Sequence, residues 1–141
     1  MLILAKNLLP TFALFLLTAP ALVMGQDISE SPLPSCPDTP NCEHQVHTFD
    51  LASSALTDHV IAALKDMDAE SIDVEQLDTI QAVFKIWKYR DDVSVAVQPN
   101  GDQSTLFVRS ASREGYSDLG VNRRRVKRFM KTLNKSIKQD K

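Results

Sequence analysis

Residues 71–111 decide the fold of this chain, and they read SIDVEQLDTIQAVFKIWKYRDDVSVAVQPNGDQSTLFVRSA. Apolar side chains recur at every second position in four runs, which is the spacing of strands with one buried face. The connections between the runs are short, and short connections favour antiparallel neighbours. Asn100-Gly101 is the clearest hairpin signal among them. The stretch therefore predicts a four-stranded antiparallel meander. Its alternating apolar positions are Ile72, Val74, Ile80, Ala82, Phe84, Ile86, Val93, Val95, Val97, Leu106 and Val108.

Helical periodicity flanks this sheet on both sides. Residues 53–67 carry apolar side chains three and four positions apart, and either serine at the start of this segment can act as its N-cap. Residues 119–138 carry a similar stripe, with Ser117 or Asp118 as the N-cap. The prediction for residues 44–141 is an α+β fold, in the order α-β-β-β-β-α. Both helices pack on one face of the four-stranded sheet in a two-layer sandwich. Residues 47–51 are a candidate for a further short strand.

Residues 1–25 have the layout of a signal peptide. One charge, on Lys6, precedes an apolar run over residues 8–24. We expect cleavage after Gly25 and export of the remaining chain to the periplasm or the exterior of the cell. A membrane-spanning helix needs about 20 apolar residues, and two prolines interrupt this shorter run. A retained membrane anchor is therefore the alternative interpretation.

Residues 26–43 form a proline-rich segment that holds both cysteines of the chain. The prolines favour an extended tether outside the core, and the string CPDTPNC favours a tight turn. Export would place Cys36 and Cys42 in an oxidising compartment, where we expect them to form a disulfide. The alternative is a metal site, because His44 and His47 could complete four nitrogen and sulfur ligands. The wide cysteine spacing favours the disulfide, so we expect no metal and no cofactor.

Charge is divided unevenly along the chain. Residues 26–108 hold 4 basic and 15 acidic residues, whereas residues 109–141 hold 11 basic and 3 acidic ones. The basic part is densest at residues 123–128 and could meet nucleic acid or an anionic membrane. No aromatic residues alternate with the basic ones as a stacking platform requires, and an exported protein rarely meets DNA. We therefore expect no nucleic-acid partner, and we keep peripheral contact with an anionic membrane as an alternative to a plain solvated helix surface.

Three strings resemble one known family. They are CPDTPNC at residues 36–42, DDV at residues 91–93 and RSASREGYSDLGVNR at residues 109–123. Together they are similar to the domain of unknown function 1499 family, over the whole expected mature chain from its first cysteine. The resemblance implies an export-associated α+β domain of the bacterial cell envelope and supplies no established activity. The chain departs from the family's usual residues at Glu43-His44-Gln45 and at Tyr89.

Polar side chains and two glycines gather where the last predicted strand leads into the last helix. Such a junction presents free backbone N–H groups that attract anions, and an arginine can hold a carboxylate or phosphate with two hydrogen bonds. The sequence therefore predicts a small anionic-ligand site, in which two aspartates orient the arginines. The alternative is that the same groups satisfy one another and only fix the junction. The candidate ligand-binding residues are Asp91, Asp92, Ser112, Arg113, Asn122 and Arg123.

Signatures of catalysis are weak. Three serines within residues 110–117, together with His59, supply the residue types of a hydrolase triad, but the chain has no Gly-x-Ser-x-Gly elbow. Asp91 and Asp92 are adjacent on a strand and point to opposite faces, which defeats concerted acid–base chemistry. We therefore expect a non-catalytic binding or interaction module of the cell envelope, whose partner is a small anionic ligand or an envelope protein. The alternatives are an enzyme acting on an envelope substrate and an auxiliary protein that contacts proteins or the membrane through its basic helix.

Overall fold

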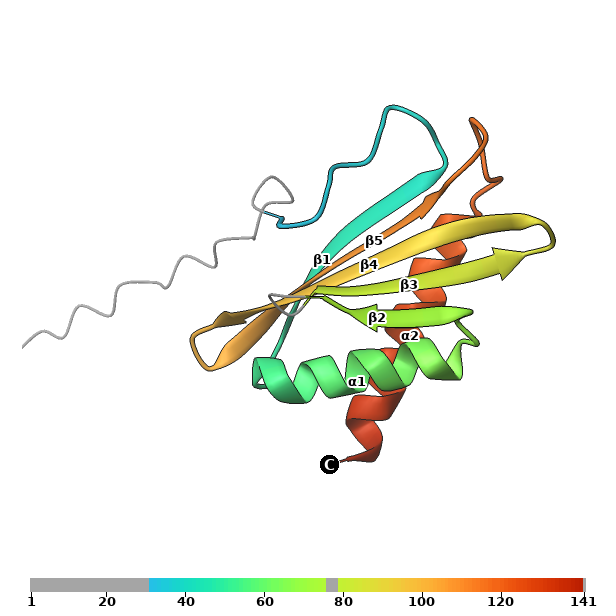
Figure 1. Ribbon diagram of the computed structural model, residues 1–141. Helices are drawn as coiled ribbons and strands as arrows, with labels where there is room; N and C mark the ends of the chain where they lie inside the picture. The colour runs from blue at the N-terminus through green and yellow to red at the C-terminus, as the bar shows by residue number, and fades with distance from the viewer. Residues whose placement is uncertain (1–30, 76–78, 141) are drawn as a thin grey trace, which may run out of the picture.

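A five-stranded antiparallel sheet and two helices make up the fold (Figure 1). The computed structural model describes residues 31–75 and 79–140. The predicted signal peptide, residues 1–25, lies outside the described residues. The elements are β1 (Cys42–Phe49), α1 (Ser53–Asp66), β2 (Ser71–Val74), β3 (Thr79–Ile86), β4 (Tyr89–Asn100), β5 (Gln103–Ser112) and α2 (Val121–Gln139).

The sheet has the strand order β1-β5-β4-β3-β2, and all of its pairings are antiparallel. Strands β2 to β5 are the predicted meander, so this part of the prediction is confirmed. The number of strands was wrong, because a fifth strand, β1, pairs with the outer edge of β5; the candidate strand at residues 47–51 overlaps only the last three residues of β1. Its register runs from Cys42 opposite Ala111 to Phe49 opposite Ser104.

Strand β1 carries almost no hydrophobic signal of its own. The side chains that alternate toward the helices include Glu43, Gln45 and His47, and the apolar Val46 and Phe49 point to opposite faces. The strand lies at the rim of the sheet, where its side chains are half-buried. Its conformation comes from backbone hydrogen bonds to β5, a long-range partner that periodicity within the strand cannot reveal.

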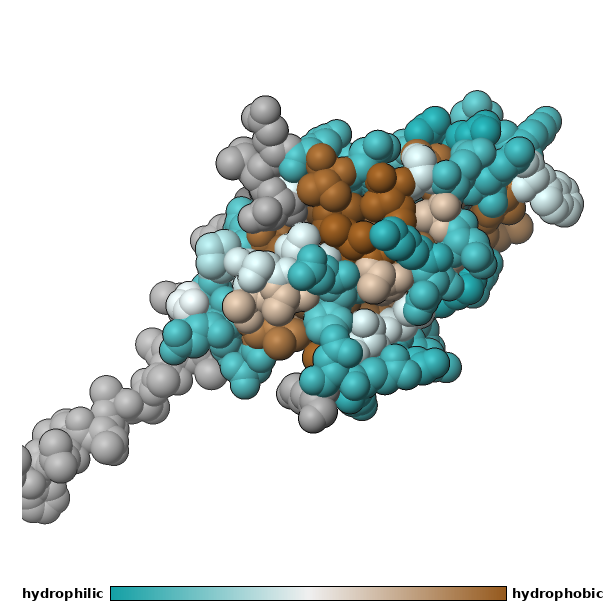
Figure 2. Space-filling view, turned by 60° about the horizontal axis from the view of Figure 1, so that its bottom comes forward, coloured by the Kyte–Doolittle hydropathy of each residue, from teal (hydrophilic) through white to brown (hydrophobic). Residues whose placement is uncertain are grey.

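Both helices cover the same face of the sheet, as predicted, and one core joins them to it. Residues of β3, β4 and β5 alternate between the two faces of the sheet, so that every second residue faces the helices and joins this core. The buried members are Leu56, Val60, Ala63, Leu64, Met67, Ile80, Ala82, Phe84, Val93, Val95, Val97, Leu106, Val108, Val126, Phe129 and Leu133. Much of the face seen in Figure 2 is hydrophilic, and its largest hydrophobic area lies near the centre, with smaller ones elsewhere.

The opposite face of the sheet carries a second, smaller core that includes Leu33. This side chain is buried against Val46, Ala96 and Phe107. The expectation that the proline-rich segment stays outside the core was therefore wrong at this residue. Both cores and the disulfide lie within residues 31–140, so a chain that begins at Gln26 keeps all of them.

The helix boundaries follow the predicted stripes to within about two residues. The expected serine caps of α1 were wrong, because the N-cap is Ala52 and it has no side-chain hydrogen bond. Helix α2 begins at Val121 after Gly120. Within residues 31–75 and 79–140, neither helix combines the length and the hydrophobicity that crossing a membrane requires.

The two histidines of β1 make the stability of the fold depend on pH. Burial lowers the pKa of His44, with a further decrease from the charge of Arg109, and burial also lowers the pKa of His47. The unfolded chain therefore takes up these protons at a higher pH than the folded chain does. Stability falls as the pH drops from about 7.5 to about 5.5. Thermal unfolding across this range should show the loss, and the His44→Gln/His47→Gln variant should lose most of this dependence. An equal dependence in the variant would contradict the prediction.

Candidate functional site

A loop of residues 113–120 joins the end of β5 to the start of α2 and turns sharply twice. Gly115 has a φ of +88° and Gly120 a φ of +76°, conformations that glycine adopts without steric cost. A Cβ at Gly120 would also lie 3.3 Å from the side chain of Arg124. The loop thus places the N-terminus of α2 beside the start of β4 and the end of β5.

Asp118 holds the first turn of α2. Its carboxylate accepts hydrogen bonds from the backbone N–H of Gly120, at 2.8 Å, and of Asn122, at 2.6 Å. Burial alone would raise the pKa of this carboxyl, but these backbone bonds and the Asn122 amide outweigh burial and lower it. The predicted N-cap, Ser117 or Asp118, was wrong, because Gly120 occupies that position; Asp118 stabilises the start of the helix from two residues earlier.

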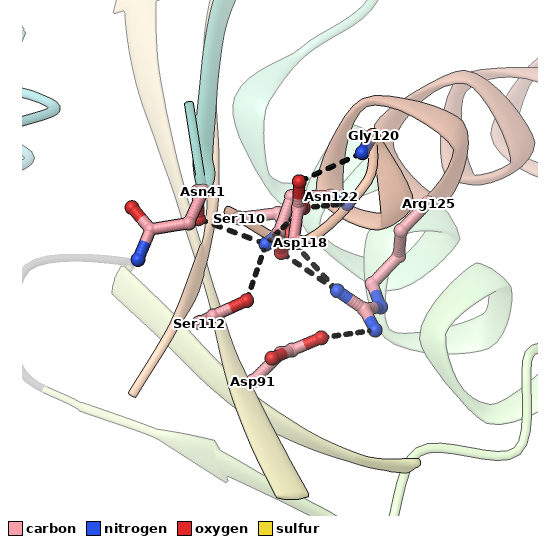
Figure 3. A network of polar contacts seen from close by, with 8 residues as sticks. All are labelled: Asn41, Asp91, Ser110, Ser112, Asp118, Gly120, Asn122 and Arg125. Carbon is pink, nitrogen blue, oxygen red and sulfur yellow. Dashed lines mark hydrogen bonds and ion pairs between the residues drawn. The ribbon is translucent and has the colours of Figure 1, made fainter. Parts of the chain in front are cut away.

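Asn122 is the centre of a buried polar network (Figure 3). Its side chain is 1% exposed and connects three segments that are far apart in the sequence. The amide oxygen accepts hydrogen bonds from Ser110 Oγ (2.5 Å) and Arg125 Nη1 (2.7 Å), and the amide nitrogen donates to Asn41 O (2.9 Å), Ser112 Oγ (2.9 Å) and Asp118 Oδ2 (2.7 Å). The network therefore fastens α2 to β5 and to the residue that precedes β1.

A buried ion pair extends the network to β4. Arg125 Nη2 lies 2.6 Å from Asp91 Oδ2, and the two side chains are 7% and 6% exposed. The guanidinium also lies 5.2 Å from the centre of the Phe84 ring and donates to Ser110 Oγ. A buried guanidinium is tolerated only when carboxylate and hydroxyl partners of this kind surround it.

Arg125 was not among the site residues predicted from the sequence. Its position in the sequence could have indicated its role. Residue 125 precedes Phe129 by one helical turn and therefore lies on the buried side of α2. A charged residue on that side needs a buried partner. Asp91, on the helix-facing side of β4, was the available carboxylate.

The structure does not collect the six candidate residues in one place. Three of them, Asp91, Ser112 and Asn122, belong to the buried network. Arg113 pairs instead with Asp92 at 2.7 Å, and both of these side chains are solvent-accessible. The predicted opposite orientation of the adjacent aspartates is thus confirmed.

The remaining candidate, Arg123, is directed away from the network. Its Nε lies 3.4 Å from Glu43 Oε2 on β1, and the Arg123 side chain is largely exposed. The two arginines predicted to hold an anion are therefore separated from each other and from Asn122.

A cavity of about 480 Å³ opens between the network and solvent. Its lining contains three carboxylates, on Asp91, Glu114 and Asp118, and one guanidinium, on Arg90. Arg90 is itself paired with Glu70 at 2.7 Å. The rest of the lining comprises Ile86, Tyr89, Ser112, Gly115, Ser117 and Val121. The cavity is thus predominantly acidic, with an aromatic ring at one side.

His59 does not meet the serines of residues 110–117 that the sequence offered for a hydrolase triad. His59 lies on α1, where Nδ1 is 2.8 Å from Ser136 Oγ and Nε2 is 3.6 Å from Asp140 Oδ2. Although these are triad residue types, Ser136 lies inside α2, where the backbone N–H groups are used by the helix. The constellation therefore has no oxyanion hole of the kind that acyl transfer needs.

The alternative metal site, formed by Cys36, Cys42, His44 and His47, is excluded because these side chains are not available as a common set of ligands. Cys36 and Cys42 form a disulfide, as predicted, so neither is available as a thiolate ligand. His44 and His47 lie three residues apart on β1 and therefore point to opposite faces of the sheet. Residues 31–75 and 79–140 contain no other cluster of three or more His, Cys, Asp or Glu side chains suited to a metal ion.

The family model described as "Protein of unknown function (DUF1499)" matches residues 32–133. The chain belongs to this family. No curated protein matches this DUF1499 chain. Among solved structures, it is similar to the crystal structure of TTHA0849 from Thermus thermophilus, with 10% sequence identity and a TM-score of 0.34. That similarity covers 70% of this chain and 94% of the other. A TM-score this low supports no conclusion about fold or function.

Proposed function

We propose that this DUF1499 protein is an exported, non-catalytic binding module of the cell envelope, with its ligand in the cavity between β4, β5 and α2. The observation that carries the proposal is this cavity of about 480 Å³, which lies on a rigid polar network. Its volume is within the range of small-molecule sites. Export is supported by the signal-peptide pattern of residues 1–25 and by the disulfide.

The chemistry of the lining favours a cationic ligand over the anion that the sequence led us to expect. Arg90 already pairs with Glu70 and Asp91 with Arg125, so the charged side chains of the lining without an ion-pair partner among the described residues are the carboxylates of Glu114 and Asp118. Glu114 is exposed and makes no ion pair within residues 31–75 and 79–140. Its carboxylate and the Tyr89 ring on the same cavity suit the ammonium group of a small amine. A free anion entering here would be repelled.

The polar groups of the cavity are occupied by structural partners, which supports binding over catalysis. Asp91 pairs with Arg125, and Asp118 accepts three hydrogen bonds at the start of α2. The Ser112 hydroxyl accepts from Asn122, and the cavity lining contains no histidine or cysteine. A serine without a neighbouring base is a poor nucleophile.

The proposal is tested by NMR titration of the chain from Gln26 to Lys141 with putrescine, and separately with inorganic phosphate. Putrescine should shift the amide resonances of Glu114, Gly115 and Val121, and phosphate should not. The Glu114→Gln variant removes the unpaired carboxylate and should weaken putrescine binding at least tenfold.

Asp102→Asn is the matched control, because it removes an exposed carboxylate in the turn between β4 and β5. This variant should bind putrescine as the original chain does. Equal binding by the Glu114→Gln variant, or shifts caused by phosphate alone, would overturn the assignment of a cationic ligand.

A further inference from the structure

The turn between β3 and β4 presents large apolar side chains to solvent. Trp87 is 89% exposed, and its neighbours Ile86 and Tyr89 are also exposed. In Figure 1 this turn projects from the right-hand end of the molecule, and pale and brown side chains project at the same end in Figure 2. An aromatic ring held this far from its own core is available to a partner outside the chain.

The backbone at Trp87 is in an unfavourable conformation. Its φ of +56° lies in the left-handed region, which bulky residues rarely adopt and glycine adopts freely. A side chain this exposed gains little packing to offset the strain. The two-residue turn between β3 and β4 requires this conformation at its first position, and glycine would supply it without strain.

The loop before α2 adds further apolar side chains at the same end. Tyr116 is 71% exposed and Leu119 is 86% exposed. The acidic cavity has Ile86 and Tyr89 of the hairpin on one side and residues of this loop on the other. The hairpin and the loop before α2 therefore border the same cavity.

Basic side chains lie on one side of the hairpin, next to Ile86. A second groove, of about 430 Å³, is lined by Lys85, Arg124 and Arg128 together with Ile86 of the hairpin. None of these three cations forms an ion pair within the described part of the chain. Arg124 instead donates to the backbone carbonyl of Leu119 at 3.0 Å. This hydrogen bond connects the loop before α2 with a cation of the basic groove.

Lys88 extends the basic surface to the turn itself. Its Nζ lies 5.3 Å from the centre of the Tyr89 ring. An aromatic ring beside a lysine, with more cations behind it, is the arrangement found where proteins meet the headgroup layer of a membrane.

We propose that this end of the molecule docks on an anionic lipid bilayer. The tip residues Trp87, Tyr89, Tyr116 and Leu119 enter the interfacial layer, and the cations of the groove contact lipid phosphates. Charge complementarity selects this occupant, because three unpaired cations of the groove, on Lys85, Arg124 and Arg128, outnumber its one unpaired carboxylate, on Asp68, and a bilayer surface supplies many anions. The projecting loops suit a soft interface, whereas a protein partner would be matched by a flatter patch.

Trp87 is the only tryptophan of the chain, so its fluorescence reports directly on the proposed contact. The chain from Gln26 to Lys141 should be mixed with vesicles of phosphatidylglycerol and phosphatidylcholine, and with vesicles of phosphatidylcholine alone. The anionic vesicles should shift the emission to shorter wavelength and carry the protein into the pellet. Added salt should reverse both effects, because it screens the cations.

Two variants test the assigned residues by co-sedimentation. Trp87→Gly removes the ring, and glycine accepts the local φ, so this variant should fold and bind at least tenfold more weakly. The combined Lys85→Gln, Arg124→Gln and Arg128→Gln variant should lose a similar factor. The matched control replaces three exposed cations nearer the other end of α2, Lys131, Lys135 and Lys138, by glutamine, and it should keep its binding.

The proposal is overturned if the emission of Trp87 does not change with anionic vesicles. It is equally overturned if the Trp87→Gly variant sediments as the original chain does. Equal losses in the two triple variants would show attraction by net charge and would remove this end of the molecule as the docking surface.

Discussion

Replacement of Asp91 by asparagine is expected to lower the free energy of unfolding by about 3–5 kcal/mol. The change preserves the shape of the side chain but leaves the Arg125 guanidinium buried without its carboxylate, which lies at 2.6 Å in the folded protein. Desolvating an unpaired charge costs far more than losing a hydrogen bond in water. Urea unfolding followed by circular dichroism measures the difference.

The neighbouring residue supplies the control for this prediction. Asp92→Asn makes the same chemical change one position along β4, where the carboxylate pairs with Arg113 on the solvent-exposed side. Exposed ion pairs contribute little, so this variant should remain close to the original stability. Similar losses in the two variants would contradict the assignment of Arg125 to a buried pair with Asp91.

The second large effect is expected for Asn122→Ala, with a loss of about 3 kcal/mol in the free energy of unfolding. The substitution removes the amide that connects α2 with β5 and with the carbonyl of Asn41. These partners stay buried, and some of them would be left without a hydrogen bond. Because Asn122 and Arg125 also bond to each other, the double variant Asp91→Asn/Asn122→Ala should lose less than the sum of the two single losses.

Asn134→Ala is the matched control on the same helix. Asn134 donates only to the carbonyl of Met130 on the exposed side of α2, and alanine is the better helix former. Its stability should therefore be unchanged or slightly higher. A loss as large as that of Asn122→Ala would show that the effect comes from the helix and not from the buried network.

The buried network, the acidic cavity and the proposed membrane-docking end share Asp91, Asp118 and Tyr89, but each of them has a test residue of its own. Asp91 and Asn122 maintain the fold, Glu114 is the test residue of the cavity, and Trp87 is the test residue of the tip. Since Glu114 and Trp87 are exposed, their variants separate loss of ligand or membrane binding from loss of folding. Failure of the membrane experiment would leave the ligand proposal standing, and the reverse also holds.

The alternation of residues 71–111 and the stripes of the two helices could be interpreted without any structure. A buried face imposes a period of two on a strand and of 3.6 on a helix, and these periods are visible in β3, β4, β5 and α2. The opposite orientation of Asp91 and Asp92 follows from the same rule. The disulfide follows from the two cysteines and the turn between them.

Tertiary structure decided the extent and pairing of the fifth strand, of which the sequence indicated only a short candidate at residues 47–51, and the partners within the polar network. Strand β1 is ordered by its hydrogen bonds to β5, although the two are more than fifty residues apart in the sequence. Arg125, and not Arg113 or Arg123, meets Asp91 because the packing of Val126 and Phe129 sets the rotation of α2. Sequence limits which residue types can pair, but the choice among several arginines depends on which of them the packed helix turns toward the sheet.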